Sequence, residues 1–103
     1  MIVHRVALHM EETPARIEIS DGRLDVTAGA WPDLGGAVAR LPHVSLELET
    51  SDRYLYADRQ GGVVLSDGFI GYGEDGAGRP LPMLDLLAWR GDDEWHVKEL
   101  CNG

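Results

Sequence analysis

The sequence predicts a single α+β domain over residues 1–103, an antiparallel sheet of β-hairpins with one short helix packed on one face. Three observations support this fold class. Apolar and polar residues alternate in several short segments, which is typical of half-buried strands. Asp-Gly dipeptides separate some of these segments, and this dipeptide favours the two-residue turn of a hairpin. A stretch near residues 32–41 instead carries apolar residues at helical spacing.

The first predicted elements are a strand over residues 2–10 and a hairpin over residues 15–27. Asp21-Gly22 best fits a two-residue type I′ turn between the hairpin strands. Such a turn fixes the register and gives three cross-strand pairs: Ile19 with Leu24, Ile17 with Val26, and Glu18 with Asp25. The apolar pairs define the core face, so the two carboxylates lie on the outer face.

A short helix is predicted over residues 32–41. Three apolar residues follow the spacing i, i+4 and i+7: Leu34, Val38 and Leu41. Pro32 suits the first helical position, and Pro42 ends the helix. Because Gly35-Gly36 costs roughly 1 kcal/mol per glycine relative to alanine, the helix must rely on packing against the sheet.

Residues 44–49 alternate strictly, and a turn over residues 50–53 leads into residues 54–58. We expect these segments to pair as a hairpin. Its inner pairs are Leu48 with Leu55 and Leu46 with Ala57, and its outer pairs are Glu49 with Tyr54 and Glu47 with Tyr56. The outer face is therefore predicted to be acidic and aromatic.

A second Asp-Gly dipeptide, Asp67-Gly68, predicts a hairpin between residues 63–66 and residues 69–72. In its register, Leu65 faces Ile70 and Val63 faces Tyr72. The glycine-rich segment 73–80 is expected to be a loop within the same domain.

Residues 84–90 and 93–99 are expected to pair around Gly91-Asp92 as a type II′ hairpin. The inner pairs would be Leu86 with Val97 and Ala88 with Trp95. The outer side would carry four residues, the second patch: Leu87, Trp89, Glu94 and His96. The alternative is a helix capped by Asp92 or Asp93, with three residues on one side: Val97, Leu100 and Cys101.

The charge of the chain limits its partners. Eighteen acidic against nine basic residues give a formal net charge of −9. This charge repels nucleic-acid phosphates and attracts a basic protein surface, although acidity also serves solubility alone. Cys101 is the single cysteine, which excludes an intrachain disulfide and fits a reducing cytosol. We expect a cytoplasmic protein, because no signal peptide or membrane-spanning run is evident.

No motif in the sequence predicts a cofactor, a metal site or an active site. The four histidines lack short metal-binding spacings, and the acidic segments lack the order of an EF-hand loop. Turn chemistry accounts for most acids at Asp67, Glu74, Asp75 and residues 92–94. No serine or cysteine has the context of a nucleophile, so we do not expect an enzyme.

The predicted outer sheet face is the main candidate for partner binding. Its members are carboxylates and tyrosines: Glu18, Asp25, Glu47, Glu49, Tyr54 and Tyr56. Carboxylates match guanidinium groups, and tyrosine rings accept cation–π contacts. The alternative is that Arg16 and Arg23 neutralise this face internally. The second patch is either a contact surface, including a homodimer edge, or is covered by the predicted helix or the N-terminal strand.

The middle of the chain resembles small acidic immunity proteins that neutralise bacterial toxins. The resemblance rests on residues 39–41 at the end of the predicted helix, followed by residues 44–48 and residues 54–56. It implies tight binding to the active site of a toxin or to an adjacent surface. Phage inhibitors of bacterial defence share this size and acidity, and would use carboxylates to imitate nucleic-acid phosphates.

The primary hypothesis is therefore a cytosolic, non-catalytic inhibitor that docks on a basic surface of a toxin or a nucleic-acid-binding protein. One alternative is a small enzyme or ligand-binding protein with a pocket near Trp89, Glu94 and His96. Another is a structural subunit of a homo-oligomer. Neither a nucleic acid nor a membrane is expected as a direct partner.

Overall fold

The computed structural model describes residues 1–32, 38–58, 62–68, 73–74, 80–81 and 85–102. Every regular element in these residues is a β-strand, so the predicted α+β class is wrong. In place of the helix over residues 32–41, β4 (Gly29–Pro32) and β5 (Val38–Leu41) pair antiparallel. Residues 33–37 lie outside the described part. A ten-residue helix with two adjacent glycines has little intrinsic stability, whereas the strand pair buries Trp31 and Leu41 in the core.

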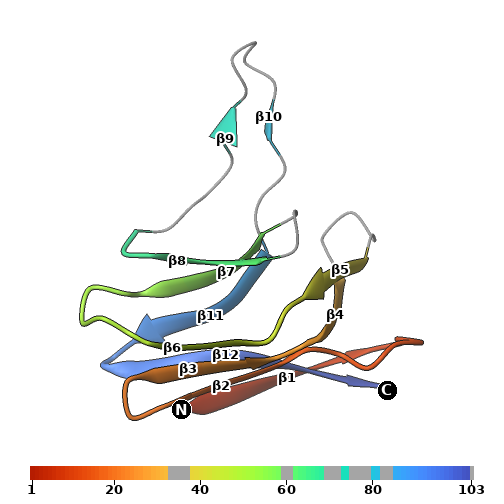
Figure 1. Cartoon of the computed structure of the whole chain (residues 1–103), viewed down its shortest axis with the longest axis horizontal. Helices are drawn as coiled ribbons and strands as arrows, with labels where there is room; N and C mark the ends of the chain where they lie inside the picture. The colour runs from red at the N-terminus through yellow and green to blue at the C-terminus, as the bar shows by residue number, and fades with distance from the viewer. Residues whose placement is uncertain (33–37, 59–61, 69–72, 75–79, 82–84, 103) are drawn as a thin grey trace.

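Two main sheets form the body of the molecule (Figure 1). The larger sheet has five described strands in the order β1 (Ile2–Leu8), β12 (Glu94–Asn102), β11 (Asp85–Gly91), β7 (Tyr54–Asp58) and β8 (Gly62–Ser66). The smaller sheet has the order β2 (Arg16–Ser20), β3 (Arg23–Thr27) and β6 (Val44–Glu47). A further pair joins β9 (Gly73–Glu74) to β10 (Pro80–Leu81).

One hydrophobic core lies between the two main sheets. The smaller sheet contributes Ile17, Ile19, Leu24 and Val26, and the larger sheet contributes Leu55, Ala57, Leu87, Ala88, Val97 and Leu100. Trp31 and Leu41 from the β4–β5 pair complete the same cluster. Because each main sheet needs the other to cover its apolar face, the molecule is a small β-sandwich.

The hairpin over residues 15–27 is confirmed in every predicted pair. Ile19 lies opposite Leu24, Ile17 opposite Val26, and Glu18 opposite Asp25. Asp21 and Gly22 both have positive φ, at 52° and 73°. These angles are the ones that a type I′ turn requires, so local turn chemistry determined this register.

The predicted hairpin between residues 44–49 and 54–58 is wrong. β6 pairs with β3, whereas β7 pairs with β8 and β11 in the other sheet. The connection over residues 48–53 therefore crosses from one sheet to the other. Alternation defines the inner face of each strand, but it does not say which strand lies beside it.

The predicted hairpin around Asp67-Gly68 lies only in part within the described residues. Residues 69–72 lie outside the described residues, and with them the predicted partners Ile70 and Tyr72. The preceding strand, β8, pairs with β7 along its whole length, from Gly62 to Ser66. Within the segment predicted as a loop, residues 73–74 and 80–81 form the short β9–β10 pair.

The C-terminal hairpin is confirmed as a hairpin, and its helical alternative is excluded. Its register differs from the prediction by two residues, because Ala88 lies opposite Val97 and not opposite Trp95. The turn residues are Asp92 and Asp93, both with positive φ. Aspartate tolerates this conformation, so the turn moves one position beyond Gly91.

The predicted N-terminal strand is also confirmed, as β1. It runs parallel to β12, from Ile2 beside His96 to Leu8 beside Asn102. β1 is an edge strand of the larger sheet among the described residues. In the same part of the chain, there is no helix of a length and hydropathy suited to crossing a bilayer.

Candidate functional site

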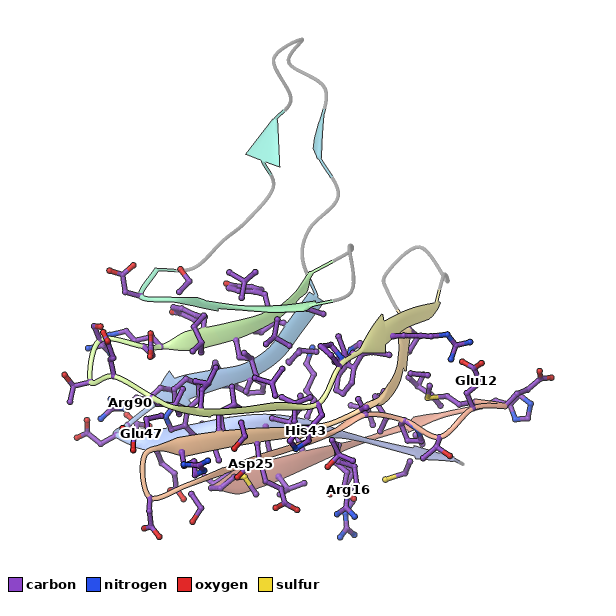
Figure 2. The ribbon with its side chains drawn as sticks, in the orientation of Figure 1. Glu12, Arg16, Asp25, His43, Glu47 and Arg90 are labelled. Carbon is purple, nitrogen blue, oxygen red and sulfur yellow. The ribbon has the colours of Figure 1, made fainter. Side chains whose placement is uncertain are left out.

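The outer face of the smaller sheet brings three predicted site residues together: Glu18, Asp25 and Glu47. Two arginines share this face, Arg16 and Arg23. Arg16 is labelled in Figure 2 together with Asp25 and Glu47. The guanidinium of Arg23 donates to Ser45 Oγ at 2.7 Å, and Ser45 Oγ donates to Asp25 Oδ1 at 2.7 Å. The negative charge of Asp25 is thus largely compensated within the face. This agrees with the alternative in which arginines of the same face neutralise its carboxylates.

The two tyrosines of the predicted site do not lie on this face. Tyr54 and Tyr56 belong to β7 in the larger sheet, with ring centroids 6.2 Å apart. Tyr54 is half-buried, and Tyr56 has an exposed fraction of 0%. A fully buried ring cannot anchor a partner, so Tyr56 has a packing role. Glu49 lies in the connection between β6 and β7 and remains exposed.

The second patch is also divided. Trp89 and His96 lie on neighbouring strands with rings stacked 5.3 Å apart, and His4 of β1 packs against both. His4 Nε2 lies 2.8 Å from His96 Nδ1, which is a hydrogen-bond distance. The N-terminal strand therefore partly covers the patch. The exposed Glu94 carboxylate instead accepts a hydrogen bond from the Met1 ammonium group at 3.1 Å.

Leu87 faces the core and not the solvent, with an exposed fraction of 0%. The register between β11 and β7 shifts between Leu86 and Ala88. Such a β-bulge places an extra residue on one strand and changes the side to which the next side chains point. The predicted outward position of Leu87 is therefore wrong.

One end of the sandwich gathers four chain turns, and sequence reasoning did not find it. The turns follow β2, β6, β8 and β11, and Figure 1 shows all four at the left of the view. Three backbone hydrogen bonds connect the segments at this end. Leu48 N–H donates to the Gly22 carbonyl at 2.7 Å, Arg53 N–H to the Ser66 carbonyl at 3.0 Å, and Arg90 N–H to the Arg53 carbonyl at 2.8 Å.

These turns and the strand residues next to them carry eight carboxylates, which we call the acidic end: Asp21, Glu47, Glu49, Asp52, Asp67, Asp92, Asp93 and Glu94. The cations beside them are Arg23, Arg53, Arg90 and the Met1 ammonium, which leaves a formal charge of −4 on this end. All eight acids are exposed except Asp52, which is half-buried. The acidic end thus holds a large share of the charge of the chain.

Turn chemistry explains four of these eight acids individually. Asp21, Asp92 and Asp93 occupy left-handed positions, and Asp52 Oδ2 accepts a hydrogen bond from Glu49 N–H at 2.8 Å. Their assembly depends on the topology, because strands that run back and forth bring alternate turns to the same end. A useful signal was present in the sequence, since each of these four turns contains an acid.

A hollow of about 520 Å³ lies between the segment after β1 and the β4–β5 pair, among Leu8, Met10, Pro32, Glu12 and Arg40. Glu12 and Arg40 form a close ion pair beside it, and Figure 2 shows Glu12 far from Glu47 and Arg90. The hydrogen bond from Arg40 to the Glu12 carboxylate, together with its charge, raises the pKa of the guanidinium above its usual value. Sequence reasoning singled out none of these side chains as a site.

The described residues contain no group of three or more histidine, cysteine, aspartate or glutamate side chains placed to hold a metal ion. The chain matches no protein-family model, no curated protein and no solved structure.

Proposed function

We propose that the protein is a non-catalytic binding protein that docks its acidic end onto a basic protein surface. The supporting observation is the meeting of four turns that, together with the adjoining strand residues Glu47 and Glu94, present eight carboxylates. Glu47 belongs both to this end and to the outer face of the smaller sheet, so the two surfaces adjoin. Within that outer face Asp25 is already compensated, which makes the acidic end the stronger attractant.

The chemistry of this end suits a partner rich in arginine and lysine. Carboxylates form charge-assisted hydrogen bonds with guanidinium groups, and a concentrated negative field steers a basic surface toward it. A protein that normally holds nucleic acid presents such a surface. The proposed role is thus inhibition of a toxin or a nucleic-acid-binding protein by occupation of its phosphate-binding surface, as an immunity protein or phage inhibitor would do.

Two matched double variants test the role of the acidic end. Asp92→Asn with Asp93→Asn removes two charges there, and asparagine tolerates the positive φ that both positions require. Glu11→Gln with Glu12→Gln removes the same number of charges beside the hollow. Both variants carry a formal charge of −7 where the wild type carries −9.

The experiment is affinity capture from the source cells with all three proteins, followed by association kinetics with the captured partner at several salt concentrations. We expect the Asp92/Asp93 variant to recover less partner, and the Glu11/Glu12 variant to recover as much as the wild type. Electrostatic steering raises association rates roughly 10- to 1,000-fold, so added salt should slow association steeply. Equal recovery by both variants, or a rate independent of salt, would refute the proposal.

A further inference from the structure

β1 is an unusual edge strand because its apolar side chains are exposed. Among the described residues, all of the exposed large hydrophobic side chains lie at its start or within it: Met1, Ile2, Val3 and Val6. Ile2, Val3 and Val6 have exposed fractions of 40%, 39% and 37%. Ile2 and Val6 point to one side of the strand and Val3 to the other. Both faces of β1 are thus open, and no single covering layer would bury them.

β1 also lacks the features that usually protect a sheet edge. Its pairing with β12 is continuous over seven residues without a bulge, and it contains no proline and no lysine. Arg5 is its single fully charged side chain. No described strand pairs with its outer edge. A straight, apolar edge of this length is a template for another strand, which would also contact both faces.

The distribution of charge favours a second copy of this chain as the added strand. Residues 1–10 contain no carboxylate, although the chain has eighteen acidic residues. Two copies can therefore meet here without placing acid against acid. The start of β1 lies beside the acidic end, because the Met1 ammonium contacts Glu94 at 3.1 Å. Antiparallel pairing would keep the two acidic ends apart, whereas parallel pairing would place them side by side.

We propose that two copies pair antiparallel through β1, about a twofold axis at His4. The axis is perpendicular to the shared sheet, so even-numbered residues of one copy lie opposite even-numbered residues of the other, with their side chains on the same face of the sheet. Centring on His4 places Ile2 opposite Val6 of the second copy in both halves. Centring on Arg5 would oppose two guanidinium groups, and centring on Val3 would leave Val6 without an apolar partner. The two larger sheets then become one continuous sheet.

The mass in solution is the first test. Light scattering after size exclusion should give twice the chain mass of 11.3 kDa at high concentration. Val6→Lys places a charge on the edge and should return the protein to one chain mass. Thr27→Lys, at an exposed position of β3, adds the same charge elsewhere and should remain dimeric. Urea unfolding of both variants checks that they fold. A single chain mass for the wild type at every concentration would overturn the proposal.

Cross-linking tests the register, in a Cys101→Ser background that removes the native thiol. In the proposed pairing, position 4 lies about 4.5–5.5 Å from its copy between Cα atoms, within reach of a disulfide. Position 5 is offset by two residues and lies about 8 Å from its copy, beyond that reach. His4→Cys should therefore form an intermolecular disulfide on mild oxidation, and Arg5→Cys should not. Equal cross-linking of both variants would overturn the register.

This dimer is independent of the proposed function. The Asp92/Asp93 variant should remain dimeric, and Val6→Lys should keep its acidic end. Failure of either proposal is therefore visible while the other still holds.

Discussion

Gly29→Ala should destabilise the protein strongly, because Gly29 sits where two backbone segments approach most closely. A Cβ atom at this position would lie 2.5 Å from Ala15 N, 2.7 Å from Pro14 C and 2.8 Å from Ala15 Cα. All three neighbours are backbone atoms, so no change of rotamer can relieve the contact. One of the two segments must move.

That movement strains two backbone hydrogen bonds made by Ala30, the residue that follows Gly29. Ala15 N–H donates to the Ala30 carbonyl at 2.9 Å, and Ala30 N–H donates to the Thr13 carbonyl at 3.0 Å. Each bond contributes about 0.5–1.5 kcal/mol, and overpacking itself costs about 1–3 kcal/mol. The expected loss in the free energy of unfolding is therefore about 2–6 kcal/mol, a large fraction of the total for a small domain.

Urea unfolding followed by tryptophan fluorescence measures this loss, with Gly68→Ala as the control. A Cβ atom on Gly68 meets nothing within 4 Å, so the control should change stability by less than about 0.5 kcal/mol. Both substitutions reduce the entropy of the unfolded chain to a similar extent, and the comparison cancels that effect. If the two variants unfold at the same urea concentration, the close approach at Gly29 is wrong.

Two further predictions test side-chain positions. Leu87→Ala should cost about 2–5 kcal/mol in urea unfolding, because the bulge turns Leu87 into the core; a cost below about 0.5 kcal/mol would instead match an outward side chain. Glu12→Gln should leave the urea midpoint unchanged, because the ion pair with Arg40 is exposed. The pKa of Arg40 is raised in the folded state, so its contribution is complete below the unfolded pKa and is lost only at strongly alkaline pH. The midpoints of wild type and variant should therefore run parallel from neutral to mildly alkaline pH, and a divergence there would contradict this.

The features that the sequence predicted correctly are those that short-range chemistry determines. The turn at Asp21-Gly22 set the register of its hairpin, because two residues with positive φ leave one way to join the strands. At the C-terminal hairpin the choice was less restricted. The predicted turn used Gly91 and Asp92, whereas the observed turn uses Asp92 and Asp93, because aspartate also tolerates positive φ. This change of turn residues moved the register of the hairpin by two residues.

The features that the sequence did not predict depend on contacts between distant segments. Alternation in residues 44–47 identified a strand, but its partner is β3 and not the strand that follows it. Trp31 and Leu41 are buried in the core through the pairing of β4 with β5. The helical spacing of apolar residues in this segment does not include the stabilisation that comes from this burial. Leu87 follows Leu86 and precedes Ala88, and three consecutive apolar residues give no sign of which one a bulge will turn inward.

The candidate site shows the same division. Glu18 and Asp25 share a face because the local turn sets their register, whereas Glu47 joins them only through the pairing of β6 with β3. The tyrosines separated from them because β7 entered the other sheet. The acidic end could not be predicted from any one turn, since its carboxylates gather only after the whole topology is in place.

The pairing of β1 with β12 also affects how the chain folds. Ile2 and His96 lie 94 residues apart in sequence but side by side in the sheet. The hairpin over residues 15–27 closes through a two-residue turn, whereas β1 must wait for a partner near the other end of the chain. At about 5–20 residues per second, the ribosome needs roughly 5–20 s to supply that partner.

During this interval a nascent chain exposes β1 along both of its edges. Ile2, Val3 and Val6 then have no neighbouring strand at all, and a β1 segment from another nascent chain offers them one. The strand pairing with this long sequence separation thus leaves an interval in which two chains can associate. Dimers could arise on a polysome before the larger sheet is complete.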